Sequence, residues 1–418
     1  MKYVVILGDG MSDYPMPELG GKTPLQAAKK PGMDFIASSG ETGLVHTIPE
    51  KVSTGSDTAN LSVMGFDPNI YYTGRSPIEA VSMGIELGSA DIAYRCNLVN
   101  LSGAEKYEDK VMVDYSSDEI SSEEAAGLIN AVNKELLAGF RNSLIFYHGI
   151  SYRHCMVWTH RGAGPSCTPP HDILTRRIGG NLPIDTDGSG DAAVLTGLMK
   201  KSYDFLSAHK INRARADRGL LPANSLWLWG QGSRLTLSSF GEKYNLTGAV
   251  ISAVDLIKGI GISAGLRVIE VEGATGTLDT NYRGKAEAAI AALDGGCDFV
   301  YVHVEAPDEC GHRHEIENKV KSIEYIDEHI VSVLLDHYKR NGEDFSIMVL
   351  PDHATPLSLR THTRDPVPFA IYRSAPRAGA PLAGDTNESS TVYDETAAAK
   401  TGFVIKQGHT LMDYFLQV

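Results

Sequence analysis

Hydrophobic and polar positions alternate regularly over the C-terminal half of the chain. Short apolar runs rich in β-branched and aromatic residues are separated by segments with helical periodicity. The runs that we predict as strands are "SLWLW" (225–229), "AVISA" (249–253), "RVIEV" (267–271), "FVYVHV" (299–304), "SIMVL" (346–350) and "FAIYR" (369–373). Strands that alternate with helices are typical of βαβ units. The pattern therefore predicts an α/β fold with a doubly wound, mostly parallel sheet.

Two of the intervening segments have clear helical patterns. "KAEAAIAALDGG" (285–296) predicts a helix that ends at a glycine. A longer helix is predicted from one apolar face, which consists of Ile323, Ile326, Ile330, Val333 and Leu334. Both helices fit the crossovers of a parallel sheet.

The middle of the chain has a different pattern. From about residue 80 to residue 220 the predicted strands are less regular and turn residues are frequent. A chain of 418 residues is longer than one hydrophobic core usually serves. We therefore predict that residues 1–75 and 220–418 form an α/β core, and that residues 76–219 form a smaller, inserted α+β cap domain.

Composition narrows the classes of partner. The net charge is −14, from 52 acidic and 38 basic residues, and no lysine- and arginine-rich run provides a nucleic-acid surface. No apolar stretch approaches the ~18 residues of a membrane span, and "YVVIL" is too short for a signal peptide. We expect neither nucleic acid nor a membrane as a partner. The five cysteines are scattered without a C-x-x-C pair, which favours the cytoplasm.

Three apolar runs are followed closely by an aspartate. Asp9 follows "KYVVIL", Asp308 follows "FVYVHV" and Asp352 follows "FSIMVL". Each aspartate alone could cap the next helix. In an open parallel sheet, however, ligands and catalytic groups gather beyond the carboxyl ends of the strands. We therefore expect the three carboxylates to share one site.

Histidines lie close behind two of these aspartates. His312 is four residues after Asp308, so one helical turn would place both side chains on one face. His353 is adjacent to Asp352, and His362 follows nine residues later. Carboxylates crowded in one crevice repel each other unless they are protonated or paired with cations. Two divalent ions are the simplest remedy, and mixed imidazole and carboxylate ligands suit manganese or zinc better than magnesium or calcium.

Ser56 is the candidate nucleophile. In "VSTGSDTANLSVMGFDP" (52–68) it follows a glycine and precedes the helical pattern of Asn60, Leu61 and Met64. Its hydroxyl could simply cap that helix. The same position favours an incoming phosphate and an alkoxide, because a helix N-terminus has free N–H groups and a positive dipole end. A metal ion in contact with Ser56 would lower the pKa of its hydroxyl, and the residues alone leave both interpretations open.

The order of these motifs resembles that of a known superfamily. Asp9 is followed by "GSD" (55–57), "DECGH" (308–312), "PDH" (351–353) and "THTRDPVP" (361–368). This order resembles the alkaline phosphatase superfamily and, more narrowly, the archaeal-type cofactor-independent phosphoglycerate mutases. The resemblance covers essentially the whole chain and includes "AYRCNLVN" (93–100), "SYRH" (151–154) and "DLIKGIGISAGL" (255–266). It implies an alkaline-phosphatase-like core that binds metal and carries out catalysis.

The resemblance also implies individual roles. One metal ion would be bound by Asp9, Ser56, Asp352 and His353, and the other by Asp308, His312 and His362. Mn²⁺ is the first choice, with Zn²⁺, Mg²⁺ or Co²⁺ as alternatives, and no bisphosphoglycerate is required. Ser56 would carry the phosphoryl group. The residues expected to hold the phosphate and carboxylate of the substrate are Arg95, Arg153, His154 and Lys258.

The reaction implied is the interconversion of 3-phosphoglycerate and 2-phosphoglycerate through phosphoserine, while the cap excludes water. Two alternatives use the same metals and serine. One is a homoserine kinase-like phosphotransferase, although the chain has no G-x-x-x-x-G-K-[ST] loop for ATP. The other is a metal-dependent phosphatase or phosphodiesterase with water as the acceptor. The segments 114–121 and 226–237 depart from the archaeal pattern and leave the substrate open.

Overall fold

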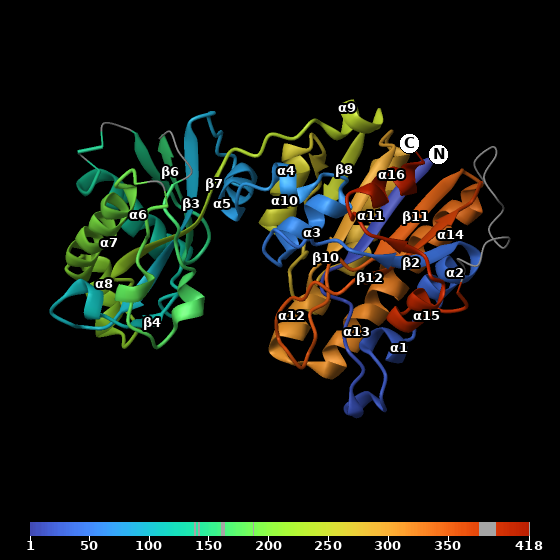
Figure 1. The fold of residues 1–418 in the computed structure, drawn as a ribbon, viewed down its shortest axis with the longest axis horizontal. Coiled ribbons are helices and arrows are strands. Elements are labelled where there is room, and N and C mark those ends of the chain that lie inside the picture. Colours follow the sequence, from blue (N-terminus) through green and yellow to red (C-terminus); the bar gives the residue numbers. More distant parts are fainter. Residues whose placement is uncertain (138, 141–142, 160–163, 187, 376–389, 418) are drawn as a thin grey trace. The chain divides into compact units, whose positions relative to one another are not determined.

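The computed structural model describes residues 1–137, 139–140, 143–159, 164–186, 188–375 and 390–417. The chain divides into two compact units, each described here by itself. The first unit comprises Met1–Tyr72 and Thr236–Val418, and the second comprises Thr73–Leu235. Figure 1 shows both units and labels their elements where there is room. Among the described residues, no helix has the length and apolarity required to cross a membrane.

The first unit is built on an eight-stranded sheet. In spatial order its strands are β13 (Val404–Ile405), β2 (Glu41–Val45), β12 (Val367–Arg373), β11 (Phe345–Leu350), β1 (Lys2–Gly8), β10 (Phe299–Val304), β8 (Gly248–Ile251) and β9 (Arg267–Val268). Only β12 runs antiparallel to its neighbours, and the other paired strands are parallel. The predicted α/β class with a mostly parallel sheet is confirmed.

Helices connect these strands (Figure 1). They are α1 (Pro24–Ala27), α2 (Pro31–Ser39), α3 (Ser56–Val63), α4 (Pro68–Tyr71), α9 (Phe240–Tyr244), α10 (Asp255–Ser263), α11 (Tyr282–Asp294), α12 (Ala306–Arg313), α13 (Ile316–Ile326), α14 (Ser332–Asn341), α15 (Glu395–Lys400) and α16 (Thr410–Leu416). A π-helical turn, Asp327–Val331, joins α13 to α14. The two helices predicted from periodicity therefore correspond to α11 and to this α13–α14 run.

Successive side chains of a strand point to opposite faces of the sheet. Nearly all residues of the central strands are buried, so both faces of the sheet are covered. Val4 of β1 and Val302 of β10 belong to a core that also contains apolar residues of α2, α11, α13 and α14. On the other face, Tyr3 contacts Phe415 of α16 edge to face, and Phe299 of β10 stacks on Phe240 of α9. Helix α3, which begins at Ser56, packs against α10 and α16. The nucleophile candidate therefore lies on a helix of this second face.

The second unit contains a separate, five-stranded antiparallel sheet. Its strands are β3 (Asp91–Leu101), β4 (Met112–Asp114), β5 (Leu144–Tyr147), β6 (Arg153–Thr159) and β7 (Ser225–Ser233), and its helices are α5 (Arg75–Ser82), α6 (Ser122–Glu135), α7 (Asp191–Ser207) and α8 (Lys210–Asp217). Strand β3 pairs with β4, β6 and β7. A buried core surrounds it, with Tyr94, Leu98, Leu198 and Trp227 among its members.

One strand lies in a different sheet from the one predicted. The sequence "SLWLW" (225–229) was expected in the main sheet, but it belongs to β7 and pairs antiparallel with β3 of the second unit. An apolar strand pattern reports burial but does not specify the partner strand. The second unit consequently extends to Leu235 rather than ending near residue 219. The transition at Tyr72 and Thr73 is close to the expected one at 75.

Candidate active site

The site lies beyond the carboxyl ends of three adjacent parallel strands. Strand β1 pairs with β10 on one side and with β11 on the other, so the residues that follow these strands emerge at one edge of the sheet. Asp9 follows β1 directly, Asp352 comes two residues after the end of β11, and Asp308 lies in the first turn of α12, after β10. Parallel pairing therefore brings the three aspartates together from distant parts of the chain.

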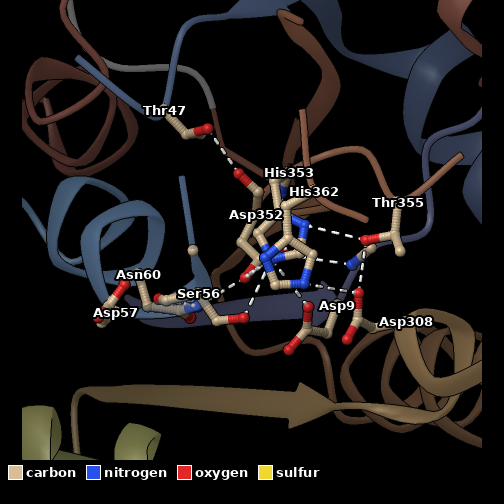
Figure 2. Close-up of polar contacts among 12 residues, drawn as sticks. Asp9, Thr47, Ser56, Asp57, Asn60, Asp308, Asp352, His353, Thr355 and His362 are labelled. Atoms are coloured by element: carbon tan, nitrogen blue, oxygen red, sulfur yellow. Dashed lines mark hydrogen bonds and ion pairs between the residues drawn. The ribbon is translucent and has the colours of Figure 1, made fainter. Parts of the chain in front are cut away.

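Asp9, Asp352 and His353 form the first group of candidate metal ligands. One ligand atom from each lies within 4.8 Å of the others, and all three side chains are buried. Nε2 of His353 is 3.4 Å from Oδ1 of Asp9 and 3.4 Å from Oδ2 of Asp352. The Ser56 hydroxyl oxygen lies 3.0 Å from the same nitrogen. Figure 2 shows Ser56 and Asp9 on the side of His353 that carries this atom.

Hydrogen bonds assign the tautomer of His353. The Thr355 hydroxyl donates to Oδ1 of Asp308, so its oxygen is left to accept from Nδ1 of His353, at 3.2 Å. A proton on Nδ1 leaves Nε2 with a lone pair. That lone pair faces Ser56 and two carboxylates, which is the arrangement of a metal-ligating histidine whose second nitrogen is held by a hydrogen bond.

Asp308, His312 and His362 form the second group, whose ligand atoms also lie within 4.8 Å of one another. Nε2 of His312 is 3.2 Å from Oδ2 of Asp308, and Nε2 of His362 is 3.4 Å from Oδ1. The two Nε2 atoms are 2.9 Å apart. Nδ1 of His312 lies 2.9 Å from the carbonyl oxygen of Arg360, to which it donates. Three ligand atoms thus converge on one point, as a single cation would require.

The pKa values of Asp9 in the first group and of Asp308 in the second are shifted in opposite directions. Burial, followed by repulsion from Asp352 and Asp308, raises the pKa of Asp9 well above its usual range. Burial also acts on Asp308, but hydrogen bonds from His312 and His362 outweigh it and hold the pKa of Asp308 well below its usual range. A hydrogen bond with Asp308 raises the pKa of His312 to about 9. The first group therefore lacks a compensating positive charge, whereas the second holds one as the proton of His312, whose place a metal ion would take.

The residues fit divalent cations. Oδ1 of Asp9 is buried and has no hydrogen-bond partner among the described residues, although an unpaired buried carboxylate oxygen is costly. The donors of both groups are carboxylate oxygens and imidazole nitrogens, a combination that suits manganese or zinc. Asp9, Asp352 and His353 could hold one ion, with Ser56 at its edge, while Asp308, His312 and His362 could hold the other.

Ser56 is not the cap of its helix. The N-cap position of α3 is Gly55, Ser56 is the first helical residue, and no side chain caps this end. Instead, the Ser56 side chain points to His353. Its backbone carbonyl accepts a hydrogen bond of 2.9 Å from the amide of Asn60, which also donates to Oδ2 of Asp352 at 2.8 Å. The interpretation of Ser56 as a simple cap is therefore not supported, and Asn60 links the start of α3 to the first group.

Two more polar residues support this site from inside strand β10. The Tyr301 hydroxyl donates to Oδ1 of Asn60 at 2.6 Å. Nε2 of His303 lies 3.0 Å from Oδ2 of Asp9, and Nδ1 of His303 lies 3.2 Å from the Ser252 hydroxyl. Sequence analysis missed both residues because "FVYVHV" resembles a uniformly buried strand. The signal that could have found them is the alternation of Tyr301 and His303 with valines.

Three of the four predicted substrate-binding residues lie in the second unit, on two faces of its sheet. Arg95 of β3 pairs with Cys155 of β6, and Arg153 pairs with Asn97 of β3, so Arg95 and Arg153 share one face of the second sheet. His154 points to the opposite face and is buried. Its Nδ1 accepts from the amide of Gly149 at 3.0 Å, and burial lowers its pKa to about 3. His154 is therefore a neutral interior histidine.

Lys258 lies on α10 of the first unit. Its amino group is 2.8 Å from each carboxylate oxygen of Glu270, and its side chain is 15% exposed. Its positive charge is therefore already partnered within this unit, while the helix that carries it packs against α3.

Known proteins are similar to this chain over nearly its whole length. A family model described as 2,3-bisphosphoglycerate-independent phosphoglycerate mutase matches residues 37–212. The mutase of that name from Methanosarcina barkeri is 50% identical over 401 residues, which cover 96% of this chain and 95% of the relative. This chain belongs to that family. The mutase from Methanothrix thermoacetophila is 47% identical over 413 residues, covering 99% of this chain and 98% of the relative.

Solved structures agree with this family assignment. A cofactor-independent phosphoglycerate mutase from Thermoplasma acidophilum superposes with a TM-score of 0.66 at 27% identity, covering 100% of this chain and 99% of that one. A protein from Pyrococcus horikoshii gives a TM-score of 0.80 at 29% identity, covering 100% and 96%. The resemblance inferred from the ordered motifs is confirmed.

Proposed function

We propose that this chain interconverts 3-phosphoglycerate and 2-phosphoglycerate by passing the phosphoryl group through Ser56. The observation that carries the proposal is the position of the Ser56 hydroxyl, 3.0 Å from His353, which belongs to the first group of candidate metal ligands. Relatives that are about half identical over nearly the whole chain have the same activity in their names. Two divalent ions, Mn²⁺ by preference, are the proposed cofactors, bound as assigned above.

The proposed reaction has two transfers. When bound, the divalent ions would lower the pKa of the serine hydroxyl and neutralise the phosphate oxygens. Ser56 Oγ loses its proton and attacks phosphorus, and the bond from phosphorus to the substrate oxygen breaks with its electron pair leaving on glycerate, whose oxygen takes up a proton. The other hydroxyl of glycerate then attacks phosphoserine, and Ser56 is restored. The overall reaction of these two transfers consumes neither water nor a second phosphate donor, so bisphosphoglycerate is not required.

The second unit is the proposed substrate domain. Of the residues considered from sequence, we retain Arg95 and Arg153 as contacts for substrate phosphate or carboxylate, because both are arginines on one face of the sheet. His154 is buried on the other face and carries no charge for such a contact. Lys258 remains a candidate only if the substrate displaces Glu270. We also propose a cytoplasmic location, because all five cysteines are free.

Phosphorylation of Ser56 tests this proposal. Purified, manganese-loaded protein is mixed with 3-phosphoglycerate and quenched in acid within a turnover, and its intact mass is measured. The expected result is a fraction of molecules with one added phosphoryl group, located on Ser56 by peptide fragmentation. A phosphoryl group on another residue, or none at any time while 2-phosphoglycerate accumulates, would contradict the assignment.

A further inference from the structure

In the second unit, one carboxylate links two arginines. Glu79 of α5 accepts from Nε of Arg75, one helical turn earlier, with 2.8 Å between Nε and Oε1. Its other oxygen, Oε2, is 3.1 Å from Nε of Arg95 on β3. Both contacts use the Nε side of the guanidinium group. A single side chain therefore sets the direction of Arg95, which we propose as a substrate contact.

Arg95 is held by two further contacts. The central carbon of its guanidinium lies 4.4 Å from the centroid of the Trp229 ring. That ring is itself held, because Nε1 of Trp229 donates to Oδ1 of Asn97 at 2.9 Å. The backbone N–H of Arg95 donates to the Ser76 hydroxyl at 2.7 Å. The guanidinium is thus restrained along one edge and one face, and its two terminal nitrogens form the remaining edge.

This arrangement carries a positive charge. The attraction of Arg95 and Arg75 outweighs burial and lowers the pKa of Glu79, to which Arg153 adds a smaller effect. The carboxylate is therefore ionised at neutral pH. Three arginines and one glutamate leave two positive charges. A bidentate anion such as a carboxylate or a phosphate is the ligand that a guanidinium edge recognises best.

We propose that Glu79 is a positioning residue. It aligns the terminal nitrogens of Arg95 toward the carboxylate or phosphate group of the substrate. This inference rests on the proposed function. An arginine side chain loses considerable rotamer freedom when it is fixed, and a receptor that is already ordered binds more tightly because that loss precedes binding. Glu79, Trp229 and Asn97 together order Arg95 in this way.

An alternative role for Glu79 predicts the opposite change in substrate binding when its charge is removed. If Glu79 only reduced the positive charge of the surrounding arginines, neutralising Glu79 would strengthen the binding of an anionic substrate. If it positions Arg95, neutralisation weakens binding although the receptor becomes more positive. Glu79→Gln separates the two, because glutamine keeps the size of the side chain but presents an N–H donor to one of the two Nε groups, which face different oxygens of Glu79.

The test compares the steady-state kinetics of three full-length, manganese-loaded proteins with 3-phosphoglycerate. We expect Glu79→Gln to raise KM by about tenfold or more and to change kcat by less than about threefold. Glu287→Gln is the matched control, because Glu287 pairs with Nε of Arg283 one turn earlier at 2.9 Å on an exposed surface. It should leave KM within about twofold of the original protein. An unchanged or lower KM in Glu79→Gln would overturn the inference.

A double-mutant cycle shows whether Glu79 acts through Arg95 rather than through general loss of structure. Arg95→Lys keeps the charge but lacks both Nε and the planar fork. In that background, Glu79→Gln should raise KM by less than about threefold more. A full, additive increase would contradict positioning through Arg95. The original protein is measured in the same series, so its failure to make 2-phosphoglycerate would contradict the proposed function, whereas normal turnover with additive effects would contradict this inference alone.

Discussion

The hydroxyl oxygen of Ser56 and Nε2 of His353 lie 3.0 Å apart, although they are almost three hundred residues apart in the chain. His353 lies three residues after the end of β11, and Ser56 is the first residue of α3. The relationship depends on Asn60, which holds the carbonyl of Ser56 and the carboxylate of Asp352 at once. Contacts within the protein therefore position the candidate nucleophile and the candidate ligands as a unit.

Removal of the nucleophile should abolish turnover without unfolding the protein. Ser56→Ala deletes only the hydroxyl, which no helix-capping bond requires. We expect kcat to fall by at least about 10³-fold with unchanged circular dichroism and metal content. Ser53→Ala, an exposed serine of the same loop, is the control and should retain full activity. Mutase activity that survives in Ser56→Ala would disprove the nucleophile assignment.

Loss of one histidine ligand should remove one metal ion. His312→Gln removes a nitrogen from the second group only, so bound manganese should fall from about two to about one per chain. His337→Gln alters a histidine paired with Asp294 outside either group and should leave the content unchanged. Metal content is measured by elemental analysis after dialysis. Chelation should inactivate the original protein, and manganese should restore its activity; full activity with no bound metal would refute the two-ion site.

Metal binding to the second group should release a proton. Without metal, the hydrogen bond to Asp308 raises the pKa of His312 from 6.5 to about 9, so His312 is protonated at neutral pH. A metal ion needs the unprotonated nitrogen. Between pH 6.5 and about 9, each unit of decrease in pH should therefore weaken binding up to about tenfold, while above this window the affinity should level off.

Calorimetric titration in two buffers with different ionisation enthalpies measures this proton directly. At pH 7.5, about one proton should be released from His312 for the ion that binds the second group of the original protein, and none from this group in His312→Gln. Equal proton release in both proteins would show that His312 is not the group that titrates.

His303 should increase the metal affinity of the first group without contacting the substrate. It donates to Asp9 and accepts from Ser252, and burial lowers its pKa so far that it stays neutral. His303→Leu removes the donor and should reduce manganese affinity about 10–100-fold, whereas His303→Gln, which retains an N–H donor, should reduce it less. Equilibrium competition with a metal-binding dye measures both. Equal affinity in the original protein and His303→Leu, with the fold intact, would rule out this role.

Much of the site could be predicted from the sequence because parallel strands deliver their ends to one edge. Asp9, Asp308 and Asp352 each follow an apolar run, and that pattern alone locates three carboxylates in space. His312 could be placed with Asp308 through helical spacing. His362 could not, since its position depends on a loop after β11, and only the family resemblance gave it a role.

The features that sequence missed depend on tertiary contacts. His303 and Tyr301 appear as interior residues of β10 until Asn60 and Asp9 are placed beside them. The pairing of β7 with β3 is not encoded in the composition of "SLWLW". His154 seemed to accompany Arg153, but adjacent strand residues point to opposite faces. Strand pairing and tertiary contacts, rather than residue type, determine what these side chains contact.

In the proposed reaction, a phosphoryl group moves between two hydroxyl groups of one substrate. The most direct measurement follows 3-phosphoglycerate by phosphorus NMR with purified protein and manganese, in the absence of bisphosphoglycerate and ATP. We expect the resonance of 2-phosphoglycerate to appear and the two esters to reach equilibrium with no inorganic phosphate. Release of inorganic phosphate alone, or a spectrum that does not change, would contradict the proposed reaction.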